Sequence, residues 1–188
     1  ASDVYKRQVP YYWGFLKKGL SLSQNIDSIL FEKDAPLRDE FKYLYASVFK
    51  KPENYVKIIE ALGTKKVGMT REEIITSTKI PNSGDLTTKL EELESCGFIR
   101  KYNAFGMKKK NAIYQLMDCF TLFYFKFLKS EPTDEHFWTN QINTPAVNTW
   151  LGLAFERVCM EHVDQIKFKL GISGVLTEVN SWYCKSDP

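Results

Sequence analysis

The residues best suited to contact a charged partner form one basic cluster. Arg100 and Lys101 are followed by Lys108, Lys109 and Lys110, so that five cationic side chains fall within eleven residues. Ammonium and guanidinium groups at this density can neutralise the phosphates of a nucleic-acid backbone. The same composition suits a lysine-rich turn that is simply solvated, or a surface that contacts an acidic partner. The sequence therefore allows contact with a DNA backbone here and leaves those two alternatives open.

Cysteine and histidine residues are too scattered along the chain to form a metal site. No two cysteines have the Cys-x-x-Cys spacing of zinc motifs, and the two histidines are far apart. Isolated thiols are typical of proteins in a reducing compartment. We therefore expect no metal site and a cytoplasmic location. The residues concerned are Cys96, Cys119, Cys159, Cys184, His136 and His162.

The composition is that of a folded protein with little excess charge. The chain has 188 residues, of which 44% are hydrophobic and 14% aromatic, which excludes a disordered tail. It has 26 lysines and arginines against 23 acidic residues, a net charge of +3. This excess is too small to indicate nucleic acid or an anionic membrane as a partner. The longest apolar run, residues 119–128, is about half of the ~20 residues that cross a bilayer, so no membrane contact is expected.

Three short helices are predicted ahead of the basic cluster. Apolar residues at three- and four-residue spacing indicate helices at 52–63 and 85–95. Between them, Thr70 and Glu73 have the spacing of a capping box, in which each side chain accepts a hydrogen bond from the other residue's backbone. The helix that they start is expected to end before Pro81, because proline disfavours the helical conformation of the residue before it.

A hairpin is predicted directly after these helices. Residues 98–102 and 112–116 have β-like patterns, and a polar turn that contains the three consecutive lysines separates them. Three short helices followed by a hairpin are typical of a winged helix-turn-helix domain. We therefore expect such a domain at residues 51–117.

The third predicted helix is acidic, which affects how such a domain could meet DNA. Residues 85–95 contain four carboxylates against one cation, Lys89, a local net charge of −3. A base-reading third helix lies in the major groove between two rows of phosphates, which would repel this charge. We therefore do not expect this helix to read bases. We expect the domain to contact other parts of the same protein. The acidic residues are Asp85, Glu91, Glu92 and Glu94.

A helical region is predicted before this domain, at residues 9–50. Ser23 or Asn25 can cap one of its helices, and Pro36 suits the first turn of the next. Residues 1–8 look like a translated sequencing-adapter scar and are excluded from the fold. The second helix has one apolar stripe, formed by Leu37, Phe41, Leu44, Tyr45 and Val48.

The region after the hairpin is predicted to contain two helices and a strand. Residues 118–144 form a linker with an aromatic-rich helix, whose aromatic side chains are expected in the core. A longer helix is capped by Thr144 and continues to Gly171, and the alternating pattern of 175–183 predicts a strand. A helix followed by a strand indicates the start of an α/β domain at 145–188. We expect the chain to be an internal fragment of a longer protein.

Several segments together resemble one protein family. They are Pro-Tyr-Tyr-Trp at 10–13, Asp-Ala-Pro-Leu-Arg-Asp-Glu-Phe at 34–41, the winged segment, and Trp-Leu-Gly-Leu-Ala-Phe-Glu at 150–156. In this order they resemble bacterial and archaeal AAA-type ATP-binding proteins of the signalling-ATPase (STAND) kind. Such proteins join a P-loop domain to a helical lid, a winged helix and a C-terminal domain similar to PD-(D/E)XK nucleases. The resemblance implies a mainly α chain: the lid, the winged helix-turn-helix, and a long helix and one strand that begin an α/β nuclease-like domain.

The resemblance also implies a nucleotide-dependent parent protein. ATP or ADP with Mg²⁺ would bind a P-loop domain that precedes residue 9, and none of these ligands is expected to bind this fragment tightly. Pro10 resembles the proline of the lid that packs against adenine, although a proline here also suits a simple helix start. The expected partners are the missing P-loop domain and the rest of the C-terminal domain.

Glu156 resembles the first acidic residue of the nuclease-like site. In that family a glutamate joins an aspartate and a Glu-x-Lys pair to bind a divalent metal that activates water. The other ligands would lie beyond Pro188, so the catalytic site is incomplete and no metal is expected in this chain. An ordinary solvated helix carboxylate is the other interpretation of Glu156.

The function expected from these observations is coupling. The lid and winged helix would transmit the nucleotide state of a parent ATPase to its nuclease-like domain, and the fragment itself would not be an enzyme. One alternative is a winged-helix DNA-binding regulator that contacts phosphates through its basic wing. Another, a metal-dependent nuclease, requires ligands beyond Pro188.

Overall fold

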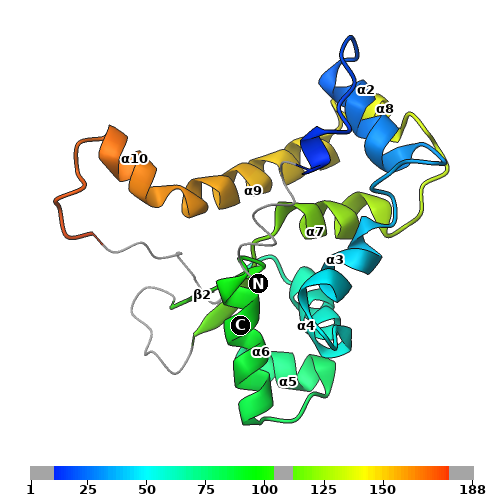
Figure 1. The fold of residues 1–188 in the computed structure, drawn as a ribbon. Coiled ribbons are helices and arrows are strands. Elements are labelled where there is room, and N and C mark those ends of the chain that lie inside the picture. Colours follow the sequence, from blue (N-terminus) through cyan, green and yellow to red (C-terminus); the bar gives the residue numbers. More distant parts are fainter. Residues whose placement is uncertain (1–10, 104–111, 178–188) are drawn as a thin grey trace. The chain divides into compact units, whose positions relative to one another are not determined.

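The computed structural model describes residues 11–103 and 112–177. This part of the chain is mainly helical with one small sheet, which confirms the predicted mainly α class (Figure 1). It forms two compact units, the first with residues 11–16 and Asp39–Lys129 and the second with Lys17–Arg38 and residues 130–177. Each unit is described by itself. The elements in chain order are α2 (Leu22–Ile26), the π-helix η1 (Asp27–Phe31), α3 (Glu40–Val48), α4 (Glu53–Gly63), β1 (Met69–Thr70), α5 (Arg71–Thr78), α6 (Gly84–Ser95), β2 (Ile99–Tyr102), β3 (Ile113–Leu116), α7 (Cys119–Phe123), the π-helix η3 (Tyr124–Leu128), α8 (Phe137–Gln141), α9 (Pro145–Glu161) and α10 (Val163–Lys169).

The three helices predicted ahead of the hairpin are present in the first unit as α4, α5 and α6. Thr70 and Glu73 form the predicted capping box at the start of α5. Lys79 follows this helix in the left-handed conformation, with a φ of 60°. The helix therefore ends before Pro81, as predicted. Ser83 caps α6 through its hydroxyl oxygen. Local sequence signals therefore determine where these helices begin and end.

The sheet of the first unit contains the predicted hairpin and one strand that was not predicted. Strands β2 and β3 pair antiparallel with Ile99 opposite Leu116, and β1 adds to β3, giving the order β1-β3-β2. Gly68 immediately precedes β1 with a φ of 88°, and a Cβ built there would lie 2.3 Å from the backbone oxygen of Tyr114. Only glycine allows so close an approach of the two backbones.

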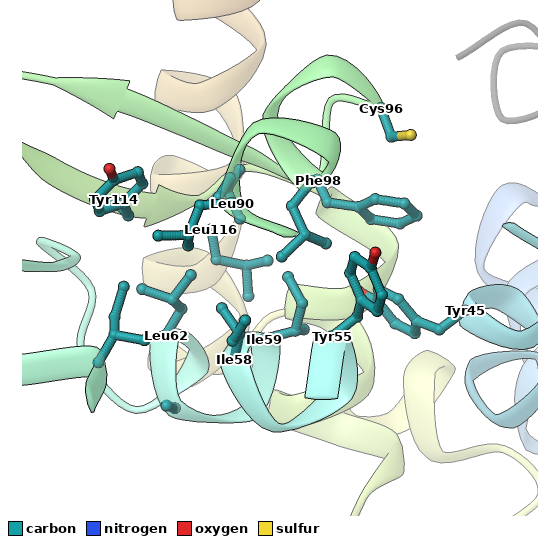
Figure 2. Close-up of a cluster of buried hydrophobic side chains, with 14 of the residues drawn as sticks. Tyr45, Tyr55, Ile58, Ile59, Leu62, Leu90, Cys96, Phe98, Tyr114 and Leu116 are labelled. Atoms are coloured by element: carbon teal, nitrogen blue, oxygen red, sulfur yellow. The ribbon is translucent and has the colours of Figure 1, made fainter. Parts of the chain in front are cut away.

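The core of the first unit lies where α4, α6 and the sheet meet, with Tyr45 of α3 and Phe98 beside them (Figure 2). The predicted apolar stripes are confirmed, because their central side chains are at most 1% exposed. These are Leu44, Tyr45, Ile58, Ile59, Leu62, Leu86, Leu90 and Leu93. Burying a leucine or isoleucine contributes about 1.5–3 kcal/mol each, so these helices depend on their packing.

The aromatic-rich helix, α7 with η3, also packs against this core, as predicted. The Thr121 hydroxyl forms a buried hydrogen bond of 2.8 Å with the Tyr45 hydroxyl. The ring of Tyr124 stacks on that of Phe41 with centroids 3.9 Å apart. Phe123 and Phe127 are buried, and Phe120, Tyr124 and Phe125 are partly buried against the core.

Two predicted helix starts are wrong. Ser21 caps α2, not Ser23 or Asn25, and Asn25 is buried inside the helix, where its amide binds backbone atoms of the preceding loop. Helix α3 begins at Glu40 and not near Pro36. Residues 36–39 form turns, which the fixed φ of proline suits as well as it suits a helix start.

In the second unit, Asp27 joins segments that are far apart in the sequence. Its carboxylate is 2% exposed and accepts hydrogen bonds from the backbone N–H groups of Trp138 (2.7 Å) and Thr139 (3.0 Å). Both groups belong to the first turn of α8, so Asp27 caps a helix 110 residues along the chain, where the short α8 has no side-chain cap of its own.

Helix α9 starts at the predicted Thr144 cap but is shorter than expected. It ends at Glu161, and α10 follows as a separate helix, so the predicted continuation to Gly171 is wrong. Of the predicted strand at 175–183, residues 175–177 form no strand and the rest lies outside the described residues. The apolar side chains of α9 are also largely exposed: Val147 is buried, whereas Phe155 is 69% exposed.

Candidate functional site

Arg100 and Lys101 lie next to each other on β2, so their side chains are on opposite faces of the sheet. The Arg100 guanidinium donates from Nε to Oε1 of Gln115 on β3 at 2.7 Å. It also lies over the Tyr102 ring, 4.6 Å from the centroid. Arg100 is therefore fixed along the sheet by neighbours on both strands.

Lys101 is more exposed, but an acidic residue lies close to it. Its ammonium is 5.8 Å from the centroid of the Tyr114 ring. Its backbone N–H donates to Oε1 of Glu94 on α6 at 3.0 Å. The Glu94 carboxylate thus lowers the positive potential at the base of the hairpin.

The structure describes only part of the predicted basic cluster. Lys108, Lys109 and Lys110 lie outside the described residues. Of the five predicted cations, Arg100 and Lys101 are therefore the two whose positions can be related to α6.

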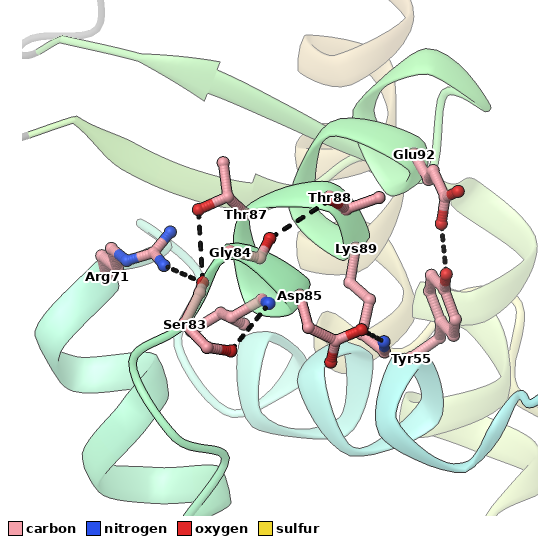
Figure 3. Close-up of polar contacts among 10 residues, drawn as sticks. Tyr55, Arg71, Ser83, Gly84, Asp85, Thr87, Thr88, Lys89 and Glu92 are labelled. Atoms are coloured by element: carbon pink, nitrogen blue, oxygen red, sulfur yellow. Dashed lines mark hydrogen bonds and ion pairs between the residues drawn. The ribbon is translucent and has the colours of Figure 1, made fainter.

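The charged side chains of α6 mostly interact with one another and with α4 (Figure 3). Lys89 forms an ion pair with Asp85 one turn earlier, and its ammonium lies 5.3 Å from the centroid of the Tyr55 ring. The Tyr55 hydroxyl donates a short hydrogen bond to Glu92. Burial is the main reason why the pKa of Tyr55 is raised, and the hydrogen bond to Glu92 raises it further. The single cation of α6, which is described over its whole length, is thus already paired.

The outward face of α6 presents threonines and carboxylates. The Thr87 and Thr88 hydroxyls donate to the backbone oxygens of Ser83 and Gly84. Glu91 is exposed one turn further along the helix. This face is suited to contact a polar or basic protein surface, and it repels phosphates.

Sequence analysis did not single out Arg71, the first residue of α5, whose side chain reaches the turn before α6. Its guanidinium donates from Nε to Oδ1 of Asn82 (3.0 Å) and from Nη2 to the backbone oxygen of Ser83 (3.0 Å). These bonds connect α5 to the turn before α6, so the residue fixes the geometry between the two helices. No local sequence pattern indicates it, because both partners are eleven or more residues away.

Glu156 lies exposed on α9 in the second unit. Among the described residues, no group of three or more histidine, cysteine or acidic side chains is placed to bind a metal ion. Arg157, the neighbour of Glu156 in the chain, is buried and donates to the backbone oxygen of Leu153 at 2.9 Å. Pro10, which is predicted to contact adenine, lies outside the described residues.

Comparison with protein-family models, curated proteins and solved structures found no match for this chain. Within the described residues, no helix is both long enough and apolar enough to cross a membrane. The geometry of α6 and the hairpin is therefore the basis for assigning a function.

Proposed function

We propose that residues 53–116 form a winged helix that acts as a protein-contact coupler, and that its third helix does not read DNA bases. Helices α4, α5 and α6 precede the hairpin in the order that this domain requires. The short β1 before α5 adds to the hairpin and completes a three-stranded sheet. These features support the winged-helix assignment, but the fold alone does not determine the function.

The main support for the coupling role is the state of the charges on α6. Its cation, Lys89, is paired with Asp85 and lies against Tyr55, while Glu91 and Glu94 remain on the exposed side. A major-groove helix needs free donors for base edges, usually arginine, lysine, asparagine or glutamine. A surface of carboxylates and threonines is better matched to a basic protein surface.

The resemblance to STAND-type ATPases suggests which protein this surface contacts. In our proposal the chain belongs to a longer switch protein, in which ATP and ADP favour different arrangements of the lid and winged helix. The exposed face of α6 contacts the P-loop domain more strongly in one arrangement than in the other. Such a difference in contact energy is what nucleotide-dependent coupling requires. The C-terminal nuclease-like domain would receive the signal, and the P-loop domain would hydrolyse ATP.

The test of this proposal uses the longer protein, with α6 changed at one exposed carboxylate. We expect Glu91→Lys to change the nucleotide exchange rate about 3-fold, since a charge at a protein contact contributes up to about 1 kcal/mol. Glu161→Lys, on an exposed position of α9, is the matched charge control and should leave exchange unchanged. Equal exchange rates in the wild type and the Glu91→Lys variant would contradict coupling through α6.

A second candidate function is a DNA-binding regulator that contacts phosphates through its wing. The exposed Lys101, followed by the three consecutive lysines, supports this alternative. Fluorescence anisotropy with a labelled duplex at low and moderate salt separates the two functions. Several phosphate contacts would produce a steep loss of affinity with salt. The coupler proposal predicts no saturable binding of the duplex even at low salt.

A further inference from the structure

We propose that the first unit contains a binding pocket for a small phosphate-bearing ligand, such as free phosphate or a phosphomonoester. The pocket lies between the end of α3, the start of α4 and α6, and has a volume of about 430 Å³. Its lining includes the side chains of Phe49, Lys50, Lys51, Tyr55, Lys89 and Glu92. These residues are on the side of α6 that packs against α4, so the pocket is distinct from the exposed face in the coupler proposal.

The charges around the pocket favour an anion. Three of the lining side chains are lysines and one is acidic. Lys50 and Lys51 are exposed and have no hydrogen-bond or ion-pair partner among residues 11–103 and 112–177. The carboxylate of Glu92 accepts the Tyr55 hydrogen bond, and Lys89 is paired with Asp85. Within the described residues, two cations at the pocket therefore have no ion-pair partner.

The walls of the pocket are fixed by aromatic packing. The Phe49 and Tyr55 rings stack with centroids 3.9 Å apart and an interplanar angle of 8°. Both residues are at most 8% exposed. Lys50 directly follows Phe49 in the chain, so the buried Phe49 side chain fixes the position of the Lys50 backbone. Lys89 has only 13% of its side chain exposed, which fixes a third cation at the inner side.

A small phosphate fits these features better than a nucleic-acid strand. A phosphate monoester has a charge of about −1.5 to −2 at pH 7 in one compact group, which several ammonium groups can contact together. A nucleic-acid strand carries further phosphates outside the pocket, which the exposed carboxylates of α6 (Asp85, Glu91 and Glu94) would repel. The acidic helix thus limits the ligand to a size near that of the pocket.

The experiment is an NMR titration of the ¹⁵N-labelled chain at low salt with sodium phosphate, and separately with phenyl phosphate. We expect saturable shifts of the backbone amides at 48–55 and 89–92. Replacing both exposed lysines, Lys50→Gln with Lys51→Gln, should weaken binding about tenfold, since each exposed ion pair contributes up to ~1 kcal/mol. Glu92→Gln keeps an acceptor for Tyr55 and removes the opposing charge, so it should tighten binding about two- to threefold.

A matched control separates a local site from a general effect of charge. Lys57→Gln with Lys66→Gln removes two exposed lysines outside the lining and lowers the net charge by the same amount. This control should bind phosphate as the wild type does. Equal weakening in both double variants, or no saturable shift with either probe, would overturn the proposal. Tighter binding of a 20-base-pair duplex through Lys50 and Lys51 would overturn the assignment to a small ligand.

Discussion

Several charged side chains in the described part of the chain form contacts that stabilise the fold. The Glu73 carboxylate accepts hydrogen bonds from the backbone N–H of Thr70 at 2.7 Å and from the Lys65 ammonium at 2.5 Å. The contact with Lys65 is the main reason why the pKa of Glu73 is lowered from its ordinary value. The Asp27 carboxylate caps α8 in a similar way in the second unit. Charges of this kind stabilise the fold and are not free to bind ligands.

The lowered pKa of Glu73 predicts a pH-dependent contribution to stability. A carboxylate with a lowered pKa stabilises the folded state above its ordinary pKa of 4.5, and this contribution is lost as the pH falls through the folded-state value. Glu73→Gln should therefore lower the free energy of unfolding at pH 7 and reduce its decrease between pH 6 and pH 3. Urea denaturation at several pH values measures both effects.

The partner variant Lys65→Gln serves as the control for this prediction. In a double-mutant cycle, the coupling between Glu73→Gln and Lys65→Gln should be measurable at pH 7 and should decrease as the pH falls below 4.5. A coupling energy that does not change with pH would show that the ion pair is not the cause.

At the scale of elements, short signals decide where helices and strands begin. The capping boxes of α2 and α5 and the hydroxyl caps of α6 and α9 each satisfy backbone N–H groups in the first turn. Strand β1 depends instead on Gly68, whose positive φ and lack of a side chain allow the chain to approach β3. The pairing of β1 with β3 thus requires glycine at position 68.

The two glycines Gly68 and Gly84 should respond in opposite ways to substitution by alanine. Gly68→Ala should destabilise the first unit by about 2 kcal/mol or more, because the new Cβ would collide with the Tyr114 backbone at a positive φ. Gly84→Ala, at the start of α6 with nothing within 4 Å of its Cβ, should stabilise by about 0.5–1 kcal/mol. Thermal unfolding of both variants gives the comparison, and equal effects would refute the role assigned to Gly68.

At the scale of the whole molecule, the described chain consists of two compact units, each with its own internal contacts. The first has a continuous core that includes Leu90 at 1% exposure. The second is held by the Asp27 cap on α8 and by the stacking of Phe31 on Phe137 at 4.9 Å. Such units are expected to open separately, each with its own free energy.

Leu90→Ala tests this separation. Truncating a fully buried leucine costs about 2–5 kcal/mol. Hydrogen exchange followed by mass spectrometry should therefore show faster exchange in peptides from 53–102 and unchanged exchange in peptides from 17–38 and 130–170. Equal acceleration in both sets of peptides would mean that the two units unfold as one.

The sequence alone determined the local structure of this protein. Apolar stripes predicted α4, α6 and the buried line of α3, and the spacing of Thr70 and Glu73 predicted the start of α5. These signals are readable because each helix end and each apolar face depends on residues within a few positions of one another. The β2–β3 hairpin follows from local patterns of the same kind.

Only the tertiary structure decided which charges are free. Lys89 looks like an available cation in the sequence, whereas in the structure it is paired with Asp85 and covered by Tyr55 from α4. Lys50 and Lys51 show no motif, yet the packing of α3, α4 and α6 brings them to one pocket with Lys89. Strand β1 and the cap that Asp27 provides also depend on residues far apart in the chain. Electrostatic contacts act through space, so their partners are fixed by packing and not by spacing along the sequence.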